Sequence, residues 1–155
     1  MMLGTLCYIE RAGKYLLLHR NRRADDMHYG LWVGLGGKLE RGESPEECII
    51  REVREESGLI ITGPVLRGII TFAGEPGDDD WYVFLFTADA FTGELKACDE
   101  GDLAWVGMDE LDGLPMHAGD RRFIKWLREK DGLFTVKFTY ENGALTDCIL
   151  YEYGR

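Results

Sequence analysis

Short apolar runs near the start of the chain predict two β-strands joined by a tight turn. Leu3–Ile9 and Lys14–His19 are mostly apolar, and the tetrapeptide Glu-Arg-Ala-Gly lies between them. This arrangement is typical of a β-hairpin. The next segment, Arg20–Tyr29, is polar, so we expect an exposed loop. The segment LWVGLGGKLERGE that follows is rich in glycine and must bend sharply.

Two segments carry the signals of α-helices. Ser44–Ser57 begins with a serine that can cap a helix and has proline at the first helical position. A glutamate three residues after the serine completes a capping box, and Gly58 is a stop signal. Asp120–Lys130 predicts a second helix because four apolar side chains recur at helical spacing. These are Phe123, Ile124, Trp126 and Leu127.

Strand signals fill much of the remaining chain. Asn142-Gly143, near the C-terminus, is a strong hairpin turn signal between two of these strands. Many strands with only two clear helices predict an α+β protein in which helices pack on a sheet. The predicted strands are Leu59–Phe72 with a break at Gly63-Pro64, Trp81–Ala88, Gly93–Cys98, Leu103–Val106, Phe134–Tyr140 and Ala144–Tyr151.

The composition of the chain excludes some classes of function and is consistent with the predicted fold. The 155 residues are interpreted as one domain over residues 1–155, and 45% of them are hydrophobic. The 18 Lys and Arg residues against 28 Asp and Glu give a formal net charge of -10. Because nucleic acids and membrane surfaces are polyanions, this charge argues against a stable nucleic-acid or membrane partner. An anionic substrate would need bound cations or a local basic cluster.

Other features predict a cytoplasmic protein. No apolar run approaches the roughly 18 residues of a membrane span. Glu10 and Arg11 interrupt the first apolar segment before a signal-peptide core could form. The four cysteines stand far apart without CxxC spacing, so we expect reduced, packed thiols. The sequence leaves a monomer and a dimer equally open.

Three glutamates share one face of the first predicted helix. Glu52, Glu55 and Glu56 are spaced i, i+3, i+4, and such like charges repel by about a few tenths of a kcal/mol per pair. A divalent cation would turn this repulsion into affinity, and hard carboxylate oxygens suit Mg²⁺ or Mn²⁺. The alternative is a solvated acidic face paired with the arginines of the same helix. The preceding Gly36-Gly37, whose carbonyls can face the same ion, favours the metal interpretation.

The segment from Gly37 to Leu59 resembles the Nudix box, whose pattern is GX5EX7REUXEEXGU with U an aliphatic residue. It reads GKLERGESPEECIIREVREESGL, and every fixed position matches. The resemblance extends from the opening hairpin to the closing one. It implies the Nudix fold, an α/β/α sandwich on a mixed sheet. It also implies hydrolysis of a nucleoside diphosphate linked to another group.

The same resemblance implies the roles of individual residues. Arg51 joins the three helix glutamates as the catalytic set, and Glu43 would help to fix the loop and the helix. An acidic residue from a later loop, Glu100, would also approach the metal. A carboxylate takes the proton of the attacking water, and Glu55, Glu56 and Glu100 all remain candidates for this base. The implied metal ligands are Gly37, Glu52, Glu55, Glu56 and Glu100.

Three segments resemble the MutT-type triphosphatases of the superfamily, which clear oxidised purine nucleotides. They are LWVGLGGKLERGE, FAGEPGDDDWYVF and KFTYENGALTDCILYEY. The implied reaction converts 8-oxo-dGTP and water to 8-oxo-dGMP and pyrophosphate. Related enzymes often read W-N-G where this chain has Trp32-Val33-Gly34, and valine cannot form the hydrogen bond of that amide. Where some relatives have a tryptophan and paired aspartates, this chain has His117 and the single Asp120.

The substrate contacts have two sources in the sequence. The basic cluster after the second strand can bind phosphates, although an ordinary solvated loop is the alternative. Aromatic side chains can stack on a base, although strand aromatics more often belong to the core. The candidates are Arg20, Arg22, Arg23, Lys38, Trp32, Phe72 and Asp120.

Two alternatives to an 8-oxo-dGTP diphosphatase stay open. Val33 and the altered segment 115–120 leave room for another nucleoside triphosphate, or for a nucleotide sugar such as ADP-ribose. A non-catalytic nucleotide-sensing Nudix module is the second, but such modules usually lose box glutamates and these are intact. RNA decapping is disfavoured by the net charge of -10.

Overall fold

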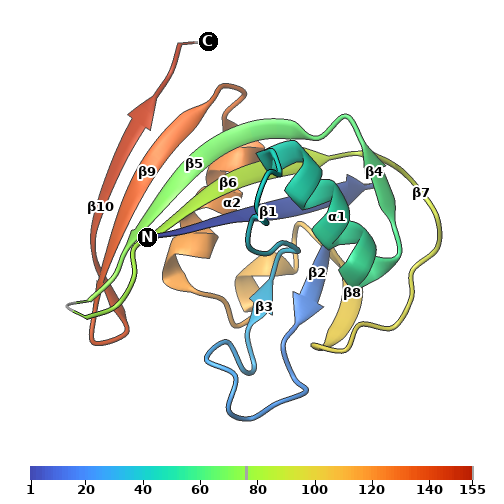
Figure 1. Cartoon of the computed structure of the whole chain (residues 1–155), viewed down its shortest axis with the longest axis horizontal. Helices are drawn as coiled ribbons and strands as arrows, with labels where there is room; N and C mark the ends of the chain where they lie inside the picture. Colours follow the sequence, from blue (N-terminus) through green and yellow to red (C-terminus); the bar gives the residue numbers. More distant parts are fainter. Residues whose placement is uncertain (76, 155) are drawn as a thin grey trace.

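The computed structural model describes residues 1–75 and 77–154 (Figure 1). Within them, strands alternate with two α-helices and one short 3₁₀ helix. The elements in chain order are β1 Met2–Arg11, β2 Lys14–His19, β3 Trp32–Val33, α1 Pro45–Ser57, β4 Ile60–Thr62, β5 Val65–Ala73, β6 Trp81–Ala88, β7 Ala90–Thr92, β8 Asp102–Gly107, η1 Leu111–Gly113, α2 Ala118–Glu129, β9 Phe134–Glu141 and β10 Ala144–Glu152.

Eight strands form one mixed β-sheet. Its order is β10-β9-β5-β6-β1-β2-β3, and β8 also pairs with β2. Strands β1 and β6 are parallel, as are β5 and β9, while the other neighbours are antiparallel. Strands β4 and β7 form a separate two-stranded sheet. The predicted α+β class and mixed sheet are therefore confirmed.

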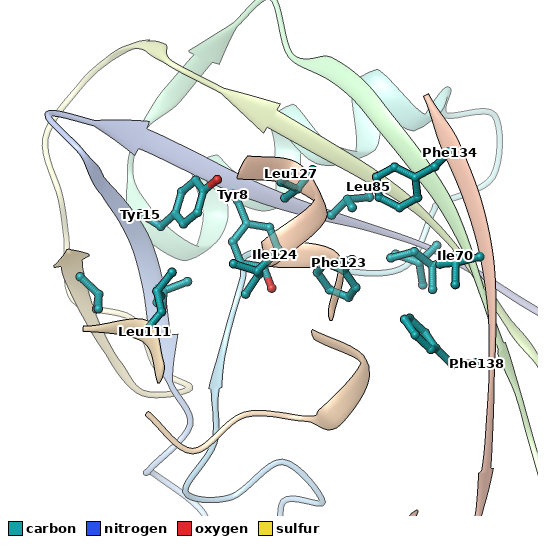
Figure 2. Packing of buried hydrophobic residues seen from close by; sticks show 14 residues of the cluster. Tyr8, Tyr15, Ile70, Leu85, Leu111, Phe123, Ile124, Leu127, Phe134 and Phe138 are labelled. Carbon is teal, nitrogen blue, oxygen red and sulfur yellow. The ribbon is translucent and has the colours of Figure 1, made fainter. Parts of the chain in front are cut away.

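The two helices cover opposite faces of the large sheet, α1 in front and α2 behind in Figure 1. Successive side chains of a strand point to opposite faces. On β1, Tyr8 packs edge-on against Phe123 of α2 with 5.8 Å between ring centroids (Figure 2). Its neighbour Cys7 belongs instead to the cluster that contains Ile49 and Val53 of α1. This is the α/β/α sandwich that the sequence predicted.

Local signals account for the first helix in detail. The side chain of Ser44 accepts a hydrogen bond from Glu47 N–H (3.0 Å), and the Glu47 carboxylate accepts one from Ser44 N–H (2.8 Å). Gly58 ends the helix in the left-handed conformation with φ 83°. The closing hairpin is also confirmed, since Asn142 and Gly143 both have the positive φ of a tight β-hairpin turn.

One predicted strand is wrong. The strand expected over Gly93–Cys98 lies earlier, where Ala90–Thr92 forms β7 and pairs with β4. The Lys96 N–H donates a hydrogen bond to the Ser57 carbonyl at 2.9 Å. This bond attaches the segment to the C-terminal end of α1 and not to a neighbouring strand. The second helix begins two residues before the predicted Asp120, at Ala118.

All four cysteines are free thiols, and three of them are buried, as expected for reduced cysteines. Over the described part of the chain, neither helix has the length and apolar character needed to cross a bilayer.

Candidate active site

The site is built where the loop before α1 folds back on the helix. Thr5 N–H of β1 donates to the carbonyl of Gly37 at 2.8 Å, which ties this loop to the sheet. A β-carbon on Gly37 would overlap the carboxylate of Glu52, so only glycine permits this approach. The loop backbone and the acidic face of α1 are thus in direct contact.

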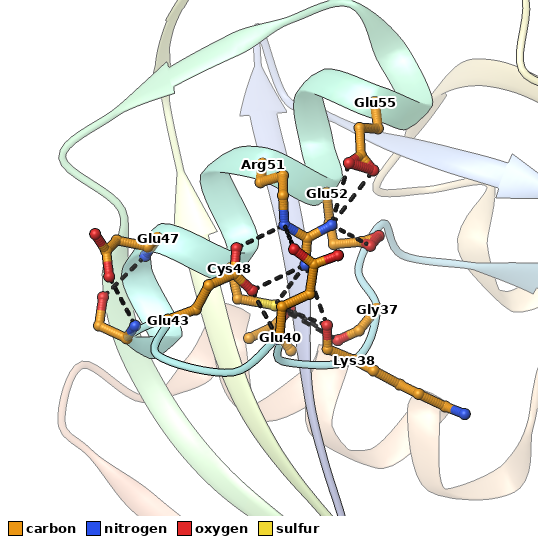
Figure 3. Close-up of polar contacts among 11 residues, drawn as sticks. Gly37, Lys38, Glu40, Glu43, Glu47, Cys48, Arg51, Glu52 and Glu55 are labelled. Atoms are coloured by element: carbon orange, nitrogen blue, oxygen red, sulfur yellow. Dashed lines mark hydrogen bonds and ion pairs between the residues drawn. The ribbon is translucent and has the colours of Figure 1, made fainter.

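Arg51 is the centre of a network that joins this loop to the helix (Figure 3). Its Nε donates to one oxygen of Glu43 at 2.6 Å and its Nη2 to the other at 2.9 Å. The guanidinium also reaches the carbonyl of Lys38 at 3.2 Å, Glu52 at 3.0 Å and Glu55 at 3.2 Å. The hydrogen bonds from Arg51 lower the pKa of Glu43 to about 2. The supporting role expected for Arg51 and Glu43 has a clear geometric basis.

Replacing Arg51 with glutamine is expected to raise the pKa of Glu43 from about 2 toward its ordinary value of 4.5. The bidentate hydrogen bond stabilises the charged carboxylate, and glutamine removes the positive charge. An NMR pH titration of the Glu43 carboxyl carbon measures the change. Arg54→Gln on the same helix is the matched control, because Arg54 forms no ion pair within the described residues. An unchanged Glu43 pKa in the Arg51 variant would contradict this role.

Glu56 is the buried member of the acidic face. Only 9% of its surface is exposed, and its Oε1 accepts a hydrogen bond from Gly36 N–H at 2.9 Å. Burial raises its pKa to about 8, and the charge of Glu100 adds to the effect. The pKa of Glu52 is also raised, first by burial. Burial thus outweighs the favourable contacts of Glu52 with Arg51 and of Glu56 with Gly36 N–H.

The carboxylate oxygens of this site are suitable ligands for a hard divalent cation, but the side chains are not arranged around a common metal position. Among residues 1–75 and 77–154, no three His, Cys, Asp or Glu side chains are grouped to hold a metal ion. Glu55 is held by Arg51, and Glu56 by Gly36 N–H. Carboxylate oxygens are the ligands that Mg²⁺ and Mn²⁺ prefer, and such a cation would neutralise their charge. A carboxylate has about four lone-pair sites, so Glu55 and Glu56 could bind such an ion while they keep these partners.

Glu100 and Arg20 form an ion pair beside this site. Arg20 Nη1 donates to Glu100 Oε1 at 2.7 Å, and its Nε donates to Asp26 at 2.8 Å. The charge of Glu100 contributes to the raised pKa of Glu56, and its role as a metal ligand stays a prediction. The structure also shows that the Arg20 guanidinium already has two carboxylate partners.

The other cationic candidates differ in how free they are. Arg22 donates to Asp102 at 2.7 Å, and exposed Arg23 lies 3.4 Å from Asp25. The basic cluster is thus largely neutralised by acidic neighbours that sequence spacing did not reveal. The ammonium of Lys38 lies 5.7 Å from the centre of the Trp81 ring, a cation–π contact. Lys38 is the candidate of this group without a carboxylate partner among the described residues.

The candidates for base binding lie toward α2. One face of Trp32 is stacked on His19, with ring centroids 4.5 Å apart, so only its other face can meet a base. Phe72 packs 5.8 Å from Phe138 within the core cluster that includes α2. Asp120 is 6% exposed, and burial raises its pKa to about 7. Its carboxyl is therefore protonated well below neutral pH and about half protonated near pH 7.

Sequence reasoning missed a histidine pair near this end of the site. His28 Nδ1 and His117 Nε2 are 2.8 Å apart, within hydrogen-bond distance. His117 is the N-cap residue of α2, and Trp32 N–H donates to the nearby Pro115 carbonyl at 2.9 Å. The pair therefore fixes loop Arg20–Tyr29 beside the N-terminus of α2. No sequence signal linked residues 89 positions apart.

Comparison with known proteins identifies the family. The family model described as NUDIX domain matches residues 2–127. The chain belongs to the Nudix family. An uncharacterized Nudix hydrolase YvcI of Bacillus subtilis is 39% identical over 140 residues, which are 88% of this chain and 85% of that protein. The Nudix box of this chain is the segment that forms the loop and the helix described above.

Two further relatives connect this Nudix hydrolase to the MutT type. The crystal structure of a mutator MutT protein from Bacillus halodurans superposes with a TM-score of 0.86, at 35% identity and 97% coverage of both chains. An oxidized purine nucleoside triphosphate hydrolase of Danio rerio is 33% identical over 126 residues, 81% of this chain and 79% of that protein. Other relatives are an ADP-ribose pyrophosphatase of Methanocaldococcus jannaschii and a CTP pyrophosphohydrolase of Escherichia coli. The comparisons thus show a MutT-type Nudix hydrolase, an enzyme that acts on nucleotides.

Proposed function

We propose that this enzyme is a Mg²⁺- or Mn²⁺-dependent nucleoside triphosphate pyrophosphohydrolase that converts 8-oxo-dGTP to 8-oxo-dGMP and pyrophosphate. The observation that carries this proposal is the unbroken Nudix box folded so that the acidic face of α1 touches the Gly37 loop. The similarity to a hydrolase named for oxidized purine nucleoside triphosphates supports the substrate class. Such an activity would keep oxidised purines out of DNA, and we expect it in the cytoplasm.

Phosphate chemistry is assigned to the α1 side of the site. Glu52, Glu55 and Glu56, with the Gly37 carbonyl and Glu100, would hold the divalent cation. When bound, that cation supplies positive charge that neutralises the phosphate oxygens. Arg51 holds two of these groups, Glu52 and Glu55, through hydrogen bonds, and it ties them to the loop through the Lys38 carbonyl.

Water activation needs a carboxylate that can accept a proton. Glu55 is the most accessible of the three candidates, since 57% of its side chain is exposed. Glu56 is buried, and each of the three candidates already accepts a hydrogen bond, Glu55 from Arg51, Glu56 from Gly36 N–H and Glu100 from Arg20. Lys38, which has no carboxylate partner within residues 1–75 and 77–154, would bind a phosphate oxygen.

Base recognition is assigned to the α2 side of the site. Because its pKa is about 7, the Asp120 carboxyl can both donate and accept a hydrogen bond near neutral pH. The free face of Trp32 and the half-buried ring of Phe72 offer apolar surface to a purine. A guanine ring with an added 8-oxo group has donors and acceptors on its edges that such a carboxyl can bind.

A different nucleotide is the second candidate substrate. Val33 offers no hydrogen bond to a base, and relatives named for CTP and ADP-ribose match this chain as well. The same box would then act on another nucleoside triphosphate or on a nucleotide sugar. A non-catalytic sensing module is the weakest alternative, because all box glutamates are present.

A turnover panel separates these candidates. With Mg²⁺ present, kcat/KM for 8-oxo-dGTP is expected to exceed that for each of the four unmodified dNTPs and for ADP-ribose. The products should be the nucleoside monophosphate and pyrophosphate. Equal rates on dGTP and 8-oxo-dGTP would contradict the sanitising role and favour a broader substrate class. Nucleotide binding without any metal-dependent product would instead favour a sensing module.

A further inference from the structure

A pair of histidines connects the loop after β2 to the start of α2. His28 Nδ1 and His117 Nε2 lie 2.8 Å apart, and the two rings meet edge-on with an interplanar angle of 87°. Both side chains are half-buried. Within residues 1–75 and 77–154, this is the only hydrogen bond between loop Arg20–Tyr29 and the segment that begins α2. The pair is therefore the polar contact that holds these two elements together.

This loop contacts both sides of the proposed site. It begins at Arg20, whose guanidinium binds Glu100, an expected metal ligand, at 2.7 Å. Gly30 N–H donates to the Arg20 carbonyl at 2.6 Å, which closes the loop at its base. On the other side, His117 is the N-cap residue of α2, and the base candidate Asp120 lies in the first turn of that helix. The loop thus has one contact with the acidic side of the site and one with the base side.

The hydrogen bond between the two rings depends on their protonation. A neutral imidazole has one nitrogen that donates and one that accepts, whereas an imidazolium only donates. The bond can form when both rings are neutral or when one of them carries an extra proton. When both rings are charged, both facing nitrogens carry a proton, so neither accepts and the two charges repel. The second proton therefore breaks the contact between the loop and the helix.

The groups around the pair favour its neutral state on the side of the loop. Burial lowers the pKa of both rings, and the charge of His28 lowers that of His117 further. Arg20 also lowers the pKa of His28, whereas Asp26 raises it and accepts a hydrogen bond from His28 N–H at 3.1 Å. The other charged residues of the loop are exposed, and they are Arg22, Arg23 and Asp25.

The side of α2 offers no negative charge in acid. Asp120 follows His117 in the first turn and is protonated well below neutral pH, because burial raises its pKa to about 7. Arg121 adds a positive charge, and its guanidinium donates to backbone carbonyls that precede α2. The adjacent strand β3 consists of the uncharged Trp32 and Val33. The pair is therefore expected to lose its hydrogen bond at a pH below 6.5, the ordinary pKa of histidine.

We propose that His28 and His117 are positioning residues for the nucleotide, because their hydrogen bond keeps loop Arg20–Tyr29 against the base side of the site. Loss of this bond in acid releases the loop and lowers the fraction of molecules that can bind the nucleotide, so the apparent affinity falls by that fraction. The inference rests on the proposed function and adds to it a control of nucleotide affinity by pH. The pair has no part in proton transfer to the substrate, so KM should change and kcat should not.

An NMR titration of the imidazole nitrogens tests the coupling of the two rings without any substrate. His28→Asn removes the neighbouring charge, so the pKa of His117 is expected to rise relative to wild type. Met27→Ala, at an exposed position of the same loop, is the matched control and should leave the pKa of His117 unchanged. The same pKa of His117 in wild type and in His28→Asn would overturn the proposal.

Binding of 8-oxo-dGMP, measured by calorimetry at pH 7.5 and pH 5.5, tests the effect on the nucleotide. His117→Ala removes the hydrogen bond and should weaken binding about tenfold at pH 7.5, the factor that corresponds to about 1.4 kcal/mol for one hydrogen bond. In His28→Asn/His117→Gln, two amides can keep a hydrogen bond that does not titrate. Between pH 7.5 and pH 5.5, wild type should therefore lose about tenfold more affinity than this double variant. Asp120 is present in all these proteins, so its own titration cancels in the comparison.

The outcomes separate this inference from the proposed function. Equal pH dependence of binding in wild type and in the double variant contradicts the inference, as does wild-type affinity in His117→Ala, and both leave the hydrolase activity standing. A kcat of His117→Ala at pH 7.5 that falls as much as its affinity contradicts a positioning role. If wild type hydrolyses a different nucleotide, the proposed substrate fails, and the monophosphate of that nucleotide replaces 8-oxo-dGMP in the same comparison. If it hydrolyses no nucleotide, both the proposed function and the inference fail.

Discussion

Replacing Glu56 with glutamine is expected to reduce metal-dependent nucleotide hydrolysis by at least about 100-fold while the fold survives, a loss typical of removing a group that takes part in proton transfer or charge stabilisation. Glutamine has almost the same shape, and its amide oxygen can still accept the hydrogen bond from Gly36 N–H. The substitution therefore removes a carboxyl that can ionise and bind a metal ion, and it leaves the packing intact. Steady-state kinetics with Mg²⁺, together with thermal unfolding, measures both parts of this result.

Glu46→Gln is the matched control for this experiment. Glu46 is exposed in the first turn of the same helix and lies outside the acidic face. Its loss should change turnover less than twofold. Full activity of the Glu56 variant would remove the basis for the metal assignment and for the proposed function. A fall in Tm of the Glu56 variant as large as its loss of activity would indicate a structural role instead.

The first helix and its loop could be predicted from sequence because their causes are local. The Ser44 cap, the Glu47 capping interaction and the Gly58 stop all act within one or two helical turns. The shared face of the box glutamates follows from helix geometry alone. The contact of Gly37 with Glu52 could be expected only through the resemblance to the Nudix family, since no local rule folds that loop onto the helix.

Contacts between residues far apart in the chain could not be predicted from the sequence, because they depend on the tertiary structure. Arg20 and Glu100 are 80 residues apart, and the pairing of β2 with β8 is what brings their loops together. A basic cluster that looked free for phosphates is therefore partly neutralised. The pairing of His28 with His117 depends in the same way on tertiary structure.

The strand predicted over Gly93–Cys98 failed for a related reason. Lys96 N–H bonds a helix terminus instead of a neighbouring strand, and the apolar pattern of the segment does not encode that choice.

Asp120 is expected to make the folded chain less stable as the pH rises from 5 to 8, and Asp120→Asn should remove this contribution. Burial raises the pKa of Asp120 from 3.8 to about 7 in the folded chain. Between these values the folded state holds a proton that the unfolded state has released, so a rising pH favours unfolding. Over the two pH units from 5 to 7 this amounts to about 3 kcal/mol. Asparagine does not titrate and should abolish that component.

Urea unfolding at pH 5 and pH 8 measures this component as a difference between proteins. The loss of unfolding free energy between the two pH values should be about 3 kcal/mol smaller in Asp120→Asn than in wild type. Asp89→Asn, at an exposed position after β6, should behave as wild type. Equal losses in wild type and the Asp120 variant would mean that Asp120 is ionised in the folded chain at neutral pH. An ionised Asp120 could only accept hydrogen bonds, so its proposed role as a donor to the nucleobase would then fail.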